Sequence, residues 1–360
     1  MSTSTTERAS LGRWTVPAAV LVVALVVAVP VAALSGAARP LELGDAGPLV
    51  RWGQVLVGVV HDLSAALTIG LLFVAAFLVP EGSRSQRRAT AARAATVTAG
   101  IWLVTALVTL VLTFGELAGL PPGAPGYLSQ LLENVWSLDY LRLLLIEAAI
   151  IALLIPLASW ARTRASLAWS CAVSLAALVP LAFTGHSAGA YGHDTAVNSL
   201  LLHLVGITVW VGGLLAIALL LPVLGNALEV TVRRFSVVAT WCFVLVAVSG
   251  VLFSTISVSS FDALSTPYGI LLQLKVGLLL VLGVAGWLQR RRILSAGVDG
   301  PARFARLAAG EAVVMGLAVA VGVVLSRTAP PVEATPAADT VTRLTGYAMP
   351  PDWSWARMLT

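Results

Sequence analysis

Residues 198–222 read NSLLLHLVGITVWVGGLLAIALLLP and contain one ionisable side chain, His203. A stretch of about 20 predominantly apolar residues is long enough to cross the hydrocarbon core of a bilayer as an α-helix. We therefore predict that these residues form a membrane-spanning helix.

The whole chain has a composition similar to that of this stretch. Of its 360 residues, 58% are apolar and 11% are charged, and the mean hydropathy is +0.93. Ordinary soluble domains carry about 25% charged residues, so this composition excludes a soluble globule. The two cysteines, Cys171 and Cys242, lie in apolar runs far from any CxxC spacing, which indicates neither a disulfide framework nor a thiolate metal site.

Eight other segments match the first in length and apolar character, which predicts an all-α, polytopic integral membrane protein. The first segment is a span rather than a signal peptide, because its apolar run from Val16 to Leu34 exceeds the usual h-region of about 7 to 15 residues. The nine predicted spans are 14–38, 53–80, 94–115, 139–160, 166–185, 198–222, 235–257, 268–288 and 305–326.

The basic residues between the spans predict the orientation. Alternate connections hold fifteen arginines on one side and five on the other, and the positive-inside rule places the richer side in the cytoplasm. Residues 1–13 are then cytoplasmic and the Pro-, Ala- and Thr-rich tail 328–360 is extracytoplasmic. The net charge of +5 is explained by topology, so no nucleic-acid partner is expected. The richer side holds Arg8, Arg13, Arg84, Arg87, Arg88, Arg93, Arg162, Arg164, Arg233, Arg234, Arg290, Arg291, Arg292, Arg303 and Arg306, and the poorer side holds Arg39, Arg51, Arg327, Arg343 and Arg357.

The spans contain an internal repeat. Aligned at their histidines, the second and sixth spans match at three positions, and the fourth and eighth spans match at two positions seven residues apart. We therefore predict a leading helix, 14–38, followed by two four-helix units, 53–185 and 198–327, in a parallel repeat about an axis along the membrane normal. The matched pairs are His61 with His203, Gly70 with Gly212, Pro80 with Pro222, Tyr140 with Tyr268, and Glu147 with Lys275.

Few ionisable side chains lie inside the predicted spans. A charge near the bilayer centre costs about 2.5 to 3.5 kcal/mol on insertion scales, so each one calls for a partner or a function. Glu147 and Lys275 are predicted to neutralise each other as a structural ion pair, and the alternative is a role in transport together with Asp62. The residues singled out are His61, Asp62, Arg142, Glu147, His203, Lys275 and Glu311, and all but Glu311 belong to the outer half.

The two span histidines are candidate metal ligands. His203 shares a helix face with residues at i+3, i+7 and i+10, and a neighbouring backbone can approach this face closely. If this face meets the His61 face of the second span, two imidazoles converge at similar depth, which suits a metal. The alternative is that each histidine simply hydrogen-bonds a facing helix. The residues predicted to pack this helix are Gly206, Trp210, Gly212 and Gly213.

Two further histidines, His186 and His193, lie in the outward loop before the sixth span, within the sequence TGHSAGAYGHD at 184–194. They are also candidate ligands, and the alternative is a polar, glycine-rich turn. Imidazole suits copper, zinc, iron and nickel, so the residue types favour an outward-facing histidine site for a metal or a haem.

Residues 198–330 hold four short motifs: HxxxxxxWxGG from His203 to Gly213, Ser249-Gly250, TPYGxxLxxK from Thr266 to Lys275, and Gln289-Arg-Arg-Arg292. Together they resemble the CopD copper-resistance family. The resemblance implies a copper-handling permease of the bacterial plasma membrane, with His203 and His61 near the copper path. Residues 344–351 are similar to the linker that joins a CopD half to a CtaG-like cytochrome oxidase assembly half in actinobacterial fusions, which implies a link between copper and oxidase maturation.

The leading hypothesis is import of copper, received as the ion or from an extracytoplasmic copper chaperone, through His186, His193, His61 and His203. One alternative is a b-type cytochrome-like electron carrier in which His61 and His203 are the axial ligands of haem b. A second alternative is an oxidase assembly factor that delivers copper without transporting it. No enzyme activity is expected, because the sequence has no phosphate-binding glycine loop.

Overall fold

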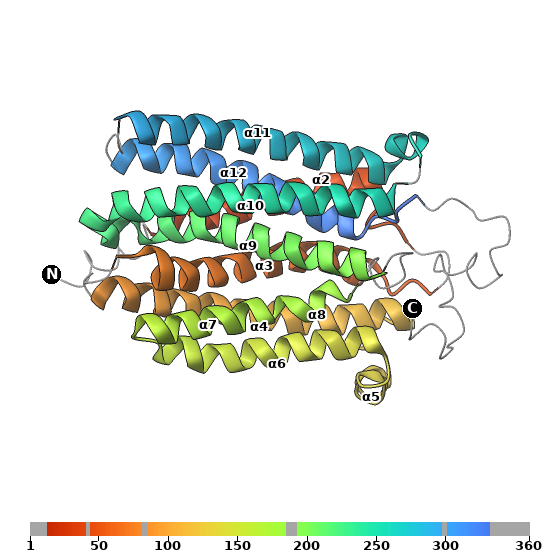
Figure 1. Cartoon of the computed structure of the whole chain (residues 1–360). Coiled ribbons are helices and arrows are strands. Elements are labelled where there is room, and N and C mark those ends of the chain that lie inside the picture. The colour runs from red at the N-terminus through yellow and green to blue at the C-terminus, as the bar shows by residue number, and fades with distance from the viewer. Residues whose placement is uncertain are drawn as a thin grey trace, which may run out of the picture.

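The computed structural model describes residues 13–40, 44–80, 85–184, 193–258, 260–296 and 301–331. Within these residues the chain is a bundle of long helices without a β-strand (Figure 1). Each predicted span falls on this set of helices, which confirms an all-α, multi-pass membrane protein. The helices are α2 (Thr15–Ser35), α3 (Pro48–Phe73) continued by the π-helix η1 (Val74–Leu78), α4 (Ser85–Ala118), α5 (Tyr127–Asn134), α6 (Asp139–Trp160), α7 (Arg164–Ala176), α8 (Leu178–Ala182), α9 (His193–Leu224), η3 (Gly225–Ala227), α10 (Leu228–Ser257), η4 (Asp262–Ser265), α11 (Pro267–Ala296) and α12 (Pro301–Ser326).

The spans differ from the prediction mainly at their ends. Eight described segments are long and apolar enough to cross a membrane, and one of them, Thr195–Thr255, covers most of both α9 and α10. The predicted span 166–185 is divided between α7 and α8. Pro180 lacks the N–H that would bond the carbonyl of Ala176, and its ring would clash with that carbonyl, so the helix breaks there.

Helices α3 and α9, which carry the two span histidines, pack against each other in the middle of the bundle (Figure 1). Their backbones touch at Gly70 and Gly212, a pair that the repeat matched. A Cβ atom on Gly70 would lie 2.0 Å from the carbonyl carbon of Gly212, and one on Gly212 would lie 1.8 Å from the carbonyl oxygen of Ala66. Glycines at such a crossing let two membrane helices approach to backbone contact. The two predicted units therefore meet at a glycine-to-glycine crossing.

The other glycines of α9 face α10 instead. Cβ atoms on Gly206 and Gly213 would lie 3.0 Å and 2.4 Å from side chains of α10, and Trp210 meets Phe243 of α10 edge-on with ring centroids 5.8 Å apart. The expected meeting of this face with the second span is therefore not found. The reason is that Gly212, about 100° round the helix from Gly213, provides the close approach to α3.

Two arginines join the units at the end of the bundle that we predict to be cytoplasmic. Arg87 of α4 donates to the carbonyl oxygen of Val223 in α9 (3.0 Å) and to Asn226 Oδ1 (2.6 Å). Arg234 of α10 donates in turn to the carbonyl oxygen of Leu78 in η1 (3.2 Å). The last carbonyls of a helix lack intrahelical partners, so the second helix of each unit caps the first helix of the other. Such reciprocity is expected of a parallel repeat and supports the proposed two-unit organisation.

Arg87→Ala is expected to lower the free energy of unfolding by about 1.5 to 3 kcal/mol, the range for hydrogen bonds to charged groups, because Arg87 is buried and makes two such bonds. Arg234→Ala, which loses one bond, should have the smaller effect. Thermal unfolding of the purified protein in detergent measures both. Arg93, which is exposed on the same helix as Arg87, provides the control variant Arg93→Ala, and an equal loss in that variant would contradict the capping role.

Candidate functional site

The intramembrane charges of the first unit form a cluster around His61 of α3. His61 Nε2 lies 2.9 Å from Glu147 Oε1 of α6. Trp102 of α4 directs its Nε1–H at the same two atoms, at 3.1 Å from His61 Nε2 and 3.2 Å from Glu147 Oε1. Glu147 and Trp102 have no exposed surface, and His61 is also buried. Three helices thus hold one buried carboxylate against one imidazole.

The second ring nitrogen of His61 also faces a carboxylate. His61 Nδ1 lies 3.2 Å from Asp62 Oδ1, whose side chain is about half exposed. Ionised carboxylates only accept hydrogen bonds, so with both carboxylates ionised both ring nitrogens donate and the ring is an imidazolium. Trp102 Nε1–H then donates to Glu147 Oε1 and not to His61 Nε2. Neither ring nitrogen of His61 then offers a lone pair to a metal. In this arrangement His61 acts as the counter-ion of two carboxylates, and the geometry does not support its predicted role as a metal ligand.

His203 of α9 has a different environment. Its Nδ1 lies 3.1 Å from Ser249 Oγ of α10, and its Cε1 lies 3.9 Å from the position that a Cβ on Gly250 would occupy. Its Nε2 is buried and has no hydrogen-bond partner among the described residues. Ser249 and Gly250 belong to one of the four motifs singled out in the sequence, and they form the surface against which this ring packs.

The hydrogen bonds of Ser249 favour one tautomer of His203. The Ser249 hydroxyl donates to the carbonyl oxygen of Val246 at 3.2 Å. That hydroxyl has one hydrogen, so when it donates to this carbonyl it accepts from His203 Nδ1–H, and the lone pair is then on Nε2. Metal-binding histidines commonly use one ring nitrogen as a hydrogen-bond donor that orients the ring while the other binds the metal. In this tautomer, His203 Nε2 has the lone pair that a metal ligand requires.

Lys275 of α11, the one lysine in the chain, lies near the second cluster. Its Nζ is 3.7 Å from the position that a Cβ on Gly322 of α12 would occupy, and it interacts electrostatically with His203 and Asp62. The predicted ion pair with Glu147 is not found, since Glu147 pairs with His61. The reason is spatial: α6 and α11 lie on opposite sides of the α3–α9 pair (Figure 1). In each predicted unit, the ionisable residue of the fourth span therefore interacts with the histidine of the same unit.

The remaining predicted residues are separate from these clusters. Arg142 pairs with Asp139 at 2.7 Å on an exposed part of α6. Glu311 faces Gln289 of α11, whose amide nitrogen, oriented to donate, lies 2.5 and 3.0 Å from its two carboxylate oxygens. His186 lies outside the described residues. His193 is the first residue of α9, and its side chain is outside the described part.

Sequence reasoning missed Trp102 altogether. It singled out Ser249 as part of a motif but did not predict its contact with His203. A signal was present for Trp102, because it lies in the middle of a predicted span rather than near an interface. A buried indole N–H requires an acceptor, which predicts a polar group at the same depth on a neighbouring helix.

The described residues do not form a complete metal cage or a haem site. No group of three or more histidine, cysteine, aspartate or glutamate side chains in this part of the chain is suited to hold a metal ion. Both ring nitrogens of His61 are already hydrogen-bonded, so the bis-histidine haem that would join His61 to His203 does not fit this arrangement.

Comparisons with known proteins agree with the motifs. Residues 45–196 match the N-terminal domain of copper resistance protein D-like proteins, and residues 229–325 match copper resistance protein D. The chain is 36% identical over 132 residues to the copper transport protein CutJ of Bacillus subtilis (strain 168), a match that covers 34% of this chain and 24% of that protein. No solved structure is detectably similar. His61, Trp102 and Glu147 lie in the first matched region, Ser249 and Lys275 lie in the second, and His203 lies between them. The chain belongs to the CopD family of copper resistance proteins.

Proposed function

We propose that this copper-handling membrane protein imports copper ions across the bacterial plasma membrane, with His203 as a copper ligand in the path. The family and the name of the Bacillus subtilis relative support copper as the substrate. The observation that carries the proposal is the buried Nε2 of His203, which has a lone pair and no hydrogen-bond partner among the described residues.

A buried polar atom without a hydrogen-bond partner needs an explanation. Leaving a buried donor or acceptor unsatisfied costs about 1 to 3 kcal/mol, and imidazole nitrogen is a good ligand for copper. A copper ion at Nε2 satisfies the atom, while Ser249 keeps the ring in the required orientation from the other side. Further ligands would be those that the arriving ion already carries, or His186 and His193, which stay proposed as outer acceptors.

The cluster of the first unit has a supporting role in this proposal. With Glu147 and Asp62 ionised and with His61 and Lys275 protonated, the described charges near the path sum to zero. Such a neutral set is tolerated in a low-dielectric bundle, whereas an excess charge is not. Asp62, whose side chain is about half exposed, is then the carboxylate most able to attract an arriving cation.

Uptake of copper into cells tests the proposal. His203→Ala is expected to reduce protein-dependent uptake to background, and Ser249→Ala to reduce it about tenfold or more, as for other residues that orient metal ligands. Thr208→Ala is the matched control, because the Thr208 hydroxyl of the same helix bonds only to carbonyls of its own turn. Parental uptake by His203→Ala at equal membrane levels would refute the role of this residue.

The direction and the link to cytochrome oxidase need their own controls. Import predicts that cells carrying the protein accumulate more copper than cells without it, and the opposite result would indicate export. Uptake should persist in cells that lack cytochrome oxidase, because an assembly factor alone would show no copper phenotype there. A CtaG-like partner and an extracytoplasmic chaperone stay proposals of the same kind.

A further inference from the structure

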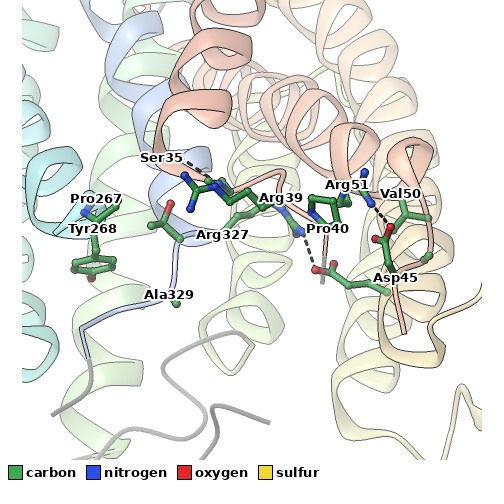
Figure 2. A pocket seen from close by; sticks show the side chains of 15 residues that line it. Ser35, Arg39, Pro40, Asp45, Val50, Arg51, Pro267, Tyr268, Arg327 and Ala329 are labelled. Atoms are coloured by element: carbon green, nitrogen blue, oxygen red, sulfur yellow. Dashed lines mark hydrogen bonds and ion pairs between the residues drawn. The ribbon is translucent and has the colours of Figure 1, made fainter. Parts of the chain in front are cut away.

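A cavity of about 360 Å³ opens at the end of the bundle that we predict to be extracytoplasmic. It lies where α2 and α12 end and α3 and α11 begin, and its lining includes Arg39, Arg51 and Arg327 (Figure 2). Asp45 and Glu116 also line it. The cavity thus holds three guanidinium groups and two carboxylates.

Three arginines in one outer cavity are unexpected from the topology. The outer segments hold five basic residues in total, because the positive-inside rule keeps arginine rare on that side. Arg343 and Arg357 lie in the tail outside the described residues. The three that the structure describes, two from around the connection between α2 and α3 and one from just after α12, all line the same cavity.

Two of the three arginines are held in place by partners. Arg51 forms an ion pair with Asp45 and donates from Nε to the carbonyl oxygen of Ala38 at 3.1 Å. Arg327 donates from Nη2 to Glu116 Oε1 at 2.8 Å. Their side chains are 16% and 19% exposed, so each guanidinium is largely enclosed and fixed in direction.

Donors remain unused in this cavity. Arg327 Nε is buried without a hydrogen-bond partner in the described part of the chain. Arg39 has no carboxylate partner among the same residues, and it leaves the described groups of the cavity with one positive charge in excess. An unsatisfied buried N–H beside an unpaired guanidinium is suited to an acceptor with negative charge.

We propose that this cavity binds an anion bearing a carboxylate or phosphate group, held by Arg39 and Arg327. Guanidinium groups bind such planar or tetrahedral oxyanions through paired N–H donors, and the orphaned Nε of Arg327 supplies one of them. A copper cation is not attracted to this group of arginines, so the site is distinct from His203. The inference does not depend on copper transport and is tested without copper.

The test uses the full chain in nanodiscs of phosphatidylcholine, with inorganic phosphate as the soluble probe and calorimetric titration as the measurement. Arg39→Gln is the primary variant, because it leaves the pairs of Arg51 and Arg327 intact. Its affinity for phosphate is expected to fall about tenfold or more, the loss of one charge-assisted contact. Arg142→Gln, an exposed outer-half arginine away from the cavity, is the matched control and should bind as the parent does.

A second arm separates a soluble anion from a lipid headgroup. Nanodiscs containing phosphatidylglycerol should raise the unfolding midpoint of the parent, but not of Arg39→Gln, if the ligand is a lipid phosphate. Arg39-dependent binding of free phosphate supports the soluble source, and an Arg39-dependent lipid effect supports the headgroup. The proposal is overturned if neither occurs, or if Arg142→Gln and Arg39→Gln lose the same amount.

Discussion

Gly212→Ala will prevent the two halves of the bundle from packing and will sharply reduce the amount of folded protein. The added Cβ would lie 1.8 Å from the carbonyl oxygen of Ala66 and 2.5 Å from its carbon. Both are backbone atoms of α3, so no side-chain rotation relieves the clash, and the two helices must move apart. We expect a loss in the free energy of unfolding at or above the upper end of the usual range of about 1 to 3 kcal/mol for overpacking.

Size-exclusion profiles and thermal unfolding of detergent-solubilised protein measure this effect. Gly100→Ala is the matched control, because Gly100 also lies inside a span but has no atom within 4 Å of the added Cβ. There the substitution should be neutral or stabilising, since alanine is favoured over glycine by up to about 1 kcal/mol within a helix. Gly70→Ala should behave like Gly212→Ala. Equal behaviour of Gly212→Ala and Gly100→Ala would show that α3 and α9 do not touch as described.

The spans were predictable, but the rotation of each helix about its axis was not. Hydropathy marks a span because lipid excludes polar backbone and side chains. It cannot say which face of an almost uniformly apolar helix meets protein, because lipid tails are as apolar as leucine. For this reason the face of α9 that carries Gly206 and Gly213 was expected on α3 and lies on α10, and Gly212 is the one of these three glycines that meets the α3 backbone.

The sequence pattern also did not predict how the charges pair, although the predicted repeat explains the observed pairing. Residues at equivalent positions of a parallel repeat lie on opposite sides of its axis unless they are close to that axis. Glu147 and Lys275 are equivalent and opposite in charge, yet each is near the histidine of its own unit. The outer cavity was not predicted either, because Arg327 is distant in sequence from Arg39 and Arg51, and all three were noted only as exceptions to the charge rule.

The effect of Glu147→Gln on the free energy of unfolding is expected to change sign with the residue at position 61. In the parent protein the substitution removes the counter-charge of His61 and destabilises the bundle. His61→Phe alone leaves the fully buried Glu147 carboxylate without its cation, and breaking a buried pair in this way costs about 3 to 5 kcal/mol. In the His61→Phe background, Glu147→Gln removes that charge and keeps an oxygen for Trp102 Nε1–H, so it should recover most of the loss.

Thermal unfolding of the parent, the two single variants and the double variant in one detergent provides the cycle. Asp139→Asn, which removes an exposed carboxylate of the same helix, should change the free energy of unfolding by about 1 kcal/mol or less. Additive losses in the double variant would refute the pairing of His61 with Glu147. Copper uptake by the folded double variant then separates the two histidines, because a counter-ion at position 61 can be replaced together with its partner, whereas a copper ligand cannot. Full loss of uptake in that stable variant would indicate that His61 is a copper ligand in the path.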